Sequence, residues 1–191
     1  MADRVSAILE MYLGGQGVGE ACDRLLFGEA NPSGRLSETF PYRLEDNPSF
    51  LHFPGNGKRV LYGEDIFVGY RYYDTKKVPV RYAFGHGLSY TEFTYGDLTL
   101  SSAQMTDEDI LTVSLKVKNS GKTEGKEVVQ LYVGDLCGIS ERPVKELKGF
   151  AKVHLLPGEE KTVSMEIRRG IYPIMKNVLG TGMRHPEHIG S

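Results

Sequence analysis

The chain has 191 residues, which is enough for one domain or two small ones. Its formal net charge is -2 with both signs interspersed, so nothing in its charge suggests nucleic acid or an anionic membrane as a partner. No apolar run approaches the roughly 20 residues that span a bilayer, and the 40% hydrophobic and 25% charged residues are ordinary for a globular protein.

Residues 5–13 begin the chain with an apolar run, VSAILEMYL, whose conformation the spacing leaves open. The apolar positions fit one face of a helix, and they fit a buried parallel strand equally well. The glycine-rich segment GGQGVG at 14–19 then interrupts the run. Apolar residues recur at three-and-four spacing from Val18 to Leu26, which predicts an amphipathic helix that ends near Gly28.

A turn, a short strand and a long loop are predicted next. NPSG at 31–34 is a strong turn signal, and residues 35–40 are a strand candidate stopped by Pro41. Residues 41–65 have little periodicity and several prolines and glycines, so they predict an ordered loop that crosses a surface. Loops of this length are uncommon unless they are functional or clamped to another domain.

Residues 67–93, FVGYRYYDTKKVPVRYAFGHGLSYTEF, join this mixed half to an all-β half. The first residues alternate as in a strand, with Val68, Tyr70 and Tyr72 on one face. The glycines of FGHGLSY mark places where the backbone turns or approaches another surface closely.

From Tyr95 onward the pattern predicts short antiparallel strands about ten residues apart, which is typical of a β-sandwich. The predicted strands begin at Leu98 and then cover residues 111–118, 128–133, 144–150, 152–156 and 162–167. Residues 128–133 are apolar on both faces apart from Gln130, so this strand is predicted to be central. Residues 170–191 do not alternate, so we expect a sandwich without its last strands, with marginal stability or self-association through its exposed edges.

Two patterns could carry chemistry, and each has a simpler interpretation. GGQGVG precedes a helix whose N-terminus could hold an anion, but it lacks the Lys-Ser/Thr and G-x-G-x-x-G spacings, which favours a tight turn. Glu64, Asp65 and Asp74 could supply the paired carboxylates of glycoside chemistry. Nothing in the sequence indicates that two of them face each other across a cleft, which favours solvated or salt-bridged roles.

The cysteines and histidines predict neither a metal site nor a cofactor. Cys22 and Cys137 fall in different halves, and free thiols are favoured over a disulfide. His185 and His188 lie in the irregular tail, and the HExxH and CxxC patterns are absent. His86 stands between two glycines, which favours a structural histidine in a turn.

The remaining candidates lie in or beside the joint. Its tyrosines and Arg71 could stack on sugar rings or pack against a neighbouring domain, and packing is favoured. The candidates for a substrate-proximal or domain-packing role are Asp65, Tyr70, Arg71, Tyr72, Tyr73 and His86. No residue is assigned a catalytic role.

Several segments, in this order, resemble the C-terminal end of glycoside hydrolase family 3, and bacterial β-glucosidases are the nearest match. They lie within residues 3–169 and read AILEMYLGGQGVGEACDRLLFGEANPSGRLSETFP, NPSFLHFPG, GEDIFVGYRYYD, FGHGLSYTEF, VKNSGKTEGKEVVQLYVGD, RPVKELKGFAKVHLLPGE and KTVSMEI. The resemblance implies a (β/α)8-type barrel, an α/β sandwich domain and a fibronectin type III-like β-sandwich. It favours a strand for residues 5–13.

The expected fold class is therefore mainly β with a small α/β piece. The main part is a fibronectin type III-like (immunoglobulin-like) β-sandwich that lacks its last strands, preceded by the C-terminal strand-helix-strand of an α/β sandwich domain. The expected limits are 1–41 for the α/β remnant, 42–93 for a linking strap, 94–169 for the incomplete β-sandwich and 170–191 for a divergent tail.

The resemblance implies a fragment of a retaining β-glucosidase-like enzyme. In the family the nucleophile is an aspartate on the barrel, and the acid/base is in many members a glutamate earlier in the α/β domain. Both regions would precede Met1, so the chain alone is expected to be inactive.

The expected partners are the missing barrel and α/β domains, with a β-linked oligosaccharide as substrate of the parent enzyme. Without those domains, Tyr70, Tyr72, Tyr73 and Phe84 are expected to be unusually exposed. The alternatives are a non-catalytic carbohydrate- or protein-binding β-sandwich module and, more remotely, an adhesion domain. The N-terminus lacks a signal-peptide form, which favours a cytoplasmic location.

Overall fold

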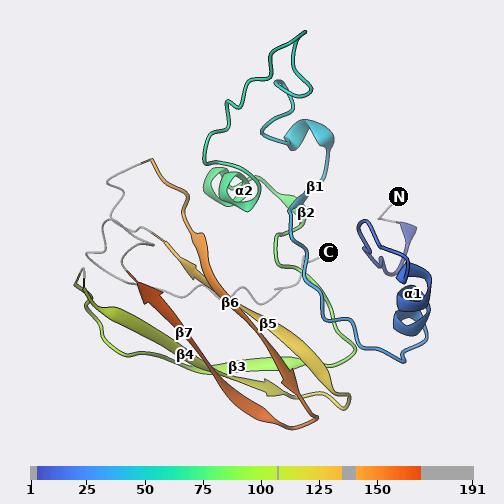
Figure 1. Cartoon of the computed structure of the whole chain (residues 1–191), viewed down its shortest axis with the longest axis vertical. Coiled ribbons are helices and arrows are strands. Elements are labelled where there is room, and N and C mark those ends of the chain that lie inside the picture. Colours follow the sequence, from blue (N-terminus) through green and yellow to red (C-terminus); the bar gives the residue numbers. More distant parts are fainter. Residues whose placement is uncertain (1–3, 107, 135–140, 169–191) are drawn as a thin grey trace.

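The computed structural model describes residues 4–106, 108–134 and 141–168. A β-sandwich forms the lower part of Figure 1, and a long, mostly irregular region lies beside and above it. The irregular region contains α1 (Val18–Leu26), β1 (Phe40–Pro41), the 3-10 helix η2 (Leu44–Asp46), α2 (Tyr70–Lys76) and β2 (Val80–Tyr82). The sandwich contains β3 (Phe93–Leu100), β4 (Ile110–Asn119), β5 (Gly125–Val133), β6 (Glu146–Leu155) and β7 (Glu160–Arg168).

The sandwich is made of two antiparallel sheets, one with the strand order β3-β4-β7 and the other with β5-β6. The predicted alternation in β4 is confirmed, because Leu111, Val113, Leu115 and Val117 are all buried. These side chains pack with inward residues of β5 and β7, such as Leu131, in two adjoining clusters. The core therefore sits between the two sheets, as expected of a sandwich.

Two predictions about the sandwich strands are wrong. Among the described strands β5 pairs only with β6, so it is not central. Its outer face is half-buried for another reason: Tyr132 and Gln130 on that face contact the segment that precedes the sandwich. The predicted interruption of β6 also does not occur, because Ala151 stays in register opposite Val129. The tail 170–191 and Cys137 lie outside the described residues, so the expected instability and self-association stay predictions.

In the N-terminal part, the helix prediction is confirmed and both strand predictions fail. α1 ends at Leu26, and Gly28 follows with a positive φ of 78°. Residues 5–13 form neither strand nor helix, because no described strand lies beside them to pair with. Within 35–40 only Phe40 joins a strand, and the two-residue β1 that it forms with Pro41 pairs with β2.

The predicted strand at the start of the joint is instead α2. Gly69 begins it with φ 55°, and Lys77 ends it in the left-handed conformation. The alternating tyrosines occupy only a few positions, too few for alternation to exclude a helix. In the helix, Tyr70 and Tyr73 are three residues apart and share a face.

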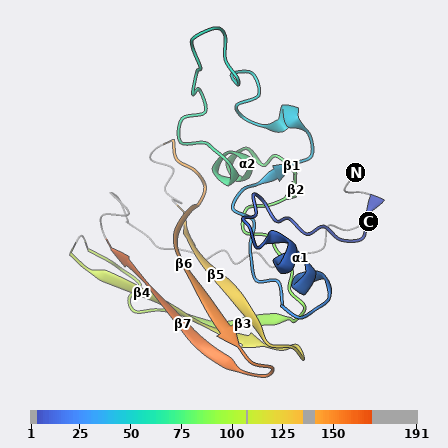
Figure 2. The ribbon, with the colours of Figure 1, turned by 45° about the vertical axis from the view of Figure 1, so that its right-hand side comes forward.

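Burial is distributed very unevenly. Thr39 is the only buried residue among residues 4–68, although this region includes α1, η2 and the long loop predicted at 41–65. In Figures 1 and 2 that loop extends beyond α2, away from the sandwich. No helix of the described residues has the length and apolar character needed to cross a membrane.

Candidate functional site

Three parts of the chain lie outside the sandwich. The N-terminal segment is residues 4–29, and the outer loop is residues 42–69. The inner strap is residues 30–41 together with residues 70–92. The two pieces of the inner strap lie side by side: the Leu36 N–H donates to the His86 carbonyl over 2.8 Å, and the Gly85 N–H donates to the Leu36 carbonyl over 2.8 Å.

Tyr70, the first residue of α2, joins the inner strap to the sandwich. Its ring centroid lies 4.9 Å from that of Phe84 and 5.8 Å from that of Tyr132. Its hydroxyl accepts a 2.8 Å hydrogen bond from the Leu147 N–H. Burial raises the pKa of Tyr132, which also lies under the Lys145 ammonium at 5.0 Å. Tyr70 is therefore committed to packing within this chain.

Two acidic residues anchor α2 through ion pairs. Asp74 lies 2.8 Å from Lys145, which confirms the salt-bridged role favoured from the sequence. Arg71 lies 3.8 Å from Glu146, which Lys148 approaches to 2.8 Å. Burial acts to raise the pKa of Glu146, but the hydrogen bond and charge of Lys148 together with the charges of Arg142 and Arg71 outweigh it, so the pKa is lowered. Arg71 thus has a partner on β6.

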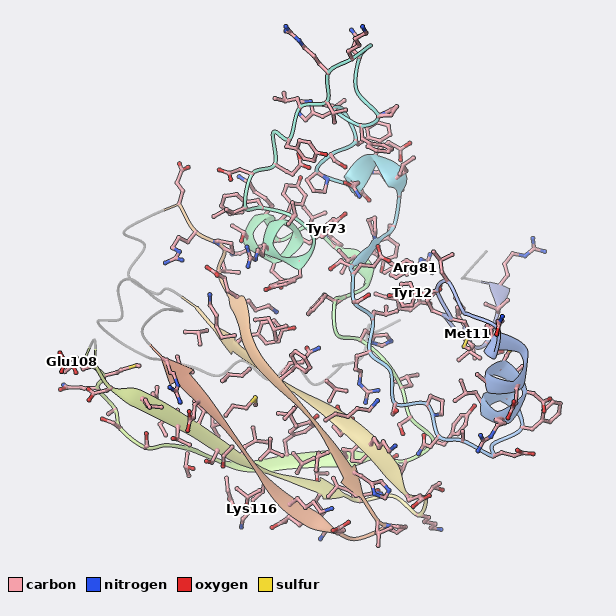
Figure 3. The ribbon with its side chains drawn as sticks, in the orientation of Figure 1. Met11, Tyr12, Tyr73, Arg81, Glu108 and Lys116 are labelled. Carbon is pink, nitrogen blue, oxygen red and sulfur yellow. The ribbon has the colours of Figure 1, made fainter. Side chains whose placement is uncertain are left out.

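The expectation that the strap aromatics are unusually exposed is wrong for Tyr73. Its side chain is 3% exposed, and burial raises the pKa of its hydroxyl. Figure 3 shows it on α2, the helix between the outer loop and the sandwich. Tyr72, whose ring meets that of Tyr73 edge-on at 5.3 Å, is half-buried, as are Tyr70 and Phe84. The helical backbone turns Tyr73 inward, which a strand reading did not predict.

The other two candidates lie apart from these anchors. Asp65 is exposed on the outer loop and has a positive φ of 50°. His86 stacks on Tyr82 at 5.5 Å, and its backbone carbonyl accepts the bond from Leu36. Burial, and to a lesser degree the charge of Arg35, lowers the pKa of His86. The turn and structural role favoured for His86 agree with this geometry.

A buried polar cluster that sequence reasoning missed lies between the inner strap and β5. The Arg35 guanidinium pairs with the Glu127 carboxylate, and both side chains are 9% exposed. The Tyr95 hydroxyl donates to the same carboxylate over 2.8 Å, and burial together with the Glu127 charge raises the pKa of Tyr95. One signal was available: Glu127 is in phase with the inward residues Val129 and Leu131 of β5.

Two asparagines complete the polar contact. Asn31 donates to the Glu124 carbonyl over 2.8 Å, and its side-chain oxygen accepts bonds from the Ser89 hydroxyl and the Tyr90 N–H. Asn119 is fully buried, and its side-chain oxygen accepts a 2.6 Å bond from the Thr91 hydroxyl. Asn31 thus joins the inner strap to the turn before β5, and Asn119, at the end of β4, joins the sandwich to Thr91 of the strap.

These residues support packing rather than chemistry. Both buried carboxylates, Glu127 and Glu146, are held in ion pairs, so neither has the exposed pairing across a cleft that glycoside hydrolysis requires. Within the described ranges, no group of three His, Cys, Asp or Glu residues could hold a metal ion. Cys22 is a free thiol, as predicted. Among the described sandwich strands only Phe150 is an exposed aromatic, which gives no planar row for stacking on sugars.

The fold and this contact define a class of protein: a fibronectin-type sandwich clamped to a segment of another domain. Residues 1–90 match the glycosyl hydrolase family 3 C-terminal domain, and residues 127–171 match the fibronectin type III-like domain. The chain belongs to glycoside hydrolase family 3 and carries its C-terminal part, including the fibronectin type III-like domain.

Relatives and solved structures agree with this assignment. The chain is 57% identical over 165 residues to the thermostable beta-glucosidase B of Acetivibrio thermocellus, covering 86% of this chain and 22% of that protein. It is 47% identical to the probable beta-glucosidase I of Emericella nidulans, covering 88% and 20%. The structure of beta-glucosidase 3B from Thermotoga neapolitana in complex with glucose superposes with a TM-score of 0.80 at 44% identity, covering 87% of this chain and 23% of that one. The chain therefore spans about a fifth of the length of these relatives.

Proposed function

We propose that the chain forms the C-terminal part of a β-glucosidase-like enzyme, which hydrolyses a terminal β-linked glucose or a related sugar. In that enzyme it contributes structure, while the nucleophile and the acid/base belong to parts that this chain does not carry. The named relatives are β-glucosidases, and the chain matches about a fifth of each.

The observation that carries the proposal is the exposed apolar surface of residues 5–68. Eighteen large apolar side chains of this stretch are exposed, against eight in the rest of the described chain. Leu26 and Phe27 at the end of α1 are 63% and 78% exposed, and Leu13 is fully exposed. Exposure of so many large apolar side chains is typical of a protein interface. The occupant that we propose is the remainder of the α/β domain together with the barrel.

The ion pairs support an accessory role for the chain. A retaining glycosidase needs two carboxyl groups about 5–5.5 Å apart on either side of the scissile bond. The buried carboxylates of this chain instead neutralise Arg35 and Lys148. Without the remaining domains, the chain is expected to give no turnover.

A complementation assay tests the proposal. The purified chain is mixed with Acetivibrio thermocellus beta-glucosidase B truncated before its matching C-terminal region, and turnover of a chromogenic aryl β-glucoside is followed. Neither part alone should turn over the substrate, and the mixture should recover activity in proportion to the complex formed. Turnover by the chain alone would overturn the accessory role. A mixture that neither associates nor reacts would overturn the proposed assembly.

A further inference from the structure

The inner strap and the sandwich are connected so closely that the usual boundary between linker and domain does not describe them. We propose that residues 30–41, 70–106, 108–134 and 141–168 form one folding unit, in which the sandwich works as a clamp that holds both ends of the outer loop. This unit would cross the limits at 41/42 and 93/94 that the sequence suggests. The N-terminal segment lies outside it.

The Arg35–Glu127 pair is the central anchor of this clamp. It joins the first piece of the inner strap to β5 across 92 positions of sequence. Both side chains are largely removed from water, and Tyr95 from β3 donates to the same carboxylate. Removing one member of a buried pair leaves an uncompensated buried charge, which is strongly destabilising. The pair therefore requires the strap to be in place whenever the sandwich is folded.

Asn31 connects both pieces of the inner strap to the turn before β5. Its amide group donates to Glu124, in the turn before β5, and its oxygen accepts from Ser89 and Tyr90 in the second piece. One side chain thus links both pieces of the strap and the sandwich. The bond to Ser89 is partly buried, so breaking it leaves a polar group without its partner, while the bonds to Glu124 and Tyr90 are exposed.

Glycines mark where the strap meets the sandwich most closely. A Cβ at Gly125 would lie 2.8 Å from Thr91 Cγ2 and 3.0 Å from Asn31 Nδ2. At Gly85, where φ is +81°, a Cβ would overlap the amide group of Gln130 on the outer face of β5. Contacts this close leave no space for water, so the strap packs as part of the domain rather than resting on it.

α2 supplies a second set of anchors at the other end of the outer loop. Asp74 pairs with Lys145 over 2.8 Å, and the Thr75 hydroxyl accepts from the Val144 N–H over 3.2 Å. The base of the outer loop is closed by pairing of β1 with β2, in which Phe40 lies opposite Tyr82. Both ends of residues 42–69 are thus fixed relative to the sandwich.

The N-terminal segment shows the opposite character. No residue of α1 is buried. The segment meets the strap through exposed hydrogen bonds, in which the Tyr12 hydroxyl accepts from the Ser37 N–H and the Leu25 carbonyl accepts from Tyr90. Exposed bonds of this kind contribute little to stability, so this segment is expected to open independently of the clamp.

Native-state hydrogen exchange of the full chain at increasing urea tests the inference. Strap amides such as those of Leu36, Gly85 and Tyr90 should become exchangeable at the same free energy as the amides of β4, which is the signature of one folding unit. Amides of the N-terminal segment should exchange far faster. Strap amides that exchange as fast as residues 4–29, while β4 stays protected, would overturn the inference.

Two variants sharpen the test. Arg35→Met should raise exchange of the strap and of β4 together by about a hundredfold or more, without changing residues 4–29. Tyr95→Phe, which keeps the ring, should give a smaller rise in exchange, again in both the strap and β4 and not in residues 4–29. The matched control is Arg24→Met, since Arg24 lies 3.8 Å from Glu29 in an exposed pair and should change nothing. Faster exchange in the strap alone would contradict a single unit.

The clamp is also proposed to present the outer loop to the rest of the enzyme, and this role rests on the proposed function. Lys145→Ala should raise the chain concentration that gives half-maximal recovery in the complementation assay, with recovery at saturation unchanged. An unshifted half-maximal concentration would overturn this presentation role. If the mixture has no activity at all, the proposed function fails, while the exchange result on the isolated chain still decides whether the clamp exists.

Discussion

The β-sandwich and residues 4–68 are both rich in large apolar side chains, but they use them in opposite ways. In the sandwich, Val117 and Leu155 on facing sheets are fully buried and belong to one cluster. In residues 4–68 Thr39 is the only buried residue, and Phe27 and Leu51 face solvent. Apolar content therefore does not define a core; a core also needs a second surface within the same chain.

Removal of a core side chain should give the largest effect and should separate the two regions. Leu155→Ala deletes a fully buried side chain between the sheets, so the free energy of unfolding should fall by about 2–5 kcal/mol. Urea denaturation followed by circular dichroism measures it. The matched control is Leu13→Ala, at a fully exposed position, which should change stability little. Equal losses in the two variants would remove the distinction between the regions.

Loss of the buried amide of Asn119, which joins β4 to the inner strap, should have the next largest effect on stability. Asn119 donates to the Thr123 carbonyl over 2.8 Å and accepts from the Thr91 hydroxyl over 2.6 Å. Asn119→Ala leaves the buried Thr91 hydroxyl without its partner, which should lower the free energy of unfolding by about 1–3 kcal/mol.

The matched control for that variant is Asn56→Ala on the exposed outer loop. Thermal melting should show a clear loss for Asn119→Ala and almost none for Asn56→Ala. An Asn119→Ala variant as stable as the parent would show that the contact between Asn119 and the inner strap does not stabilise the fold.

Sequence reasoning succeeded where local backbone geometry decides the structure of a segment. The alternation from Leu111 to Val117 identified β4, and three-and-four spacing identified α1, because both periods come from local backbone geometry. It failed where the structure depends on a partner. Residues 5–13 have the composition of a buried strand, but a strand forms only beside another strand, and the described chain provides none there.

The candidate site was predicted in part for the same reason. Tyr70 packs on Tyr132 and Arg71 pairs with Glu146, which are contacts between the inner strap and the sandwich. Packing of these residues against a neighbouring domain stays a prediction. Tyr73 was expected to be exposed because the domains it would pack on are missing, but α2 buries it within this chain. The Arg35–Glu127 pair joins positions 92 residues apart, and no local period reports such a contact. The charged residue in phase with the apolar face of β5 was the only hint.

The pH dependence of stability should distinguish the inner strap from the rest of the chain, with a smaller change in the free energy of unfolding. Burial lowers the pKa of His86 in the folded chain below the ordinary value of 6.5. Between that lowered pKa and 6.5 the unfolded chain binds more protons than the folded chain, so stability should fall as the pH falls through this window. Below the folded pKa this contribution stops changing.

His86→Phe keeps an aromatic ring against Tyr82 but cannot titrate. Its melting temperature should therefore depend less on pH between pH 7 and pH 5 than that of the parent chain. Melting curves collected at half-unit pH steps measure the difference. Identical slopes for the two chains would show that His86 does not contribute to acid sensitivity.

The smallest effect on the isolated chain is expected at the exposed end of α1. Phe27 is 78% exposed, so Phe27→Ser should change the free energy of unfolding by no more than about 0.5 kcal/mol. In the complementation assay the same change should weaken association, because an apolar side chain that is exposed here would be buried against the partner domain. Phe150→Ser is the matched control, since Phe150 is 71% exposed but lies on β6 of the sandwich. If Phe27→Ser and Phe150→Ser weaken recovery equally, α1 is not the docking surface. If Phe27→Ser unfolds the isolated chain, the N-terminal segment belongs to the clamp.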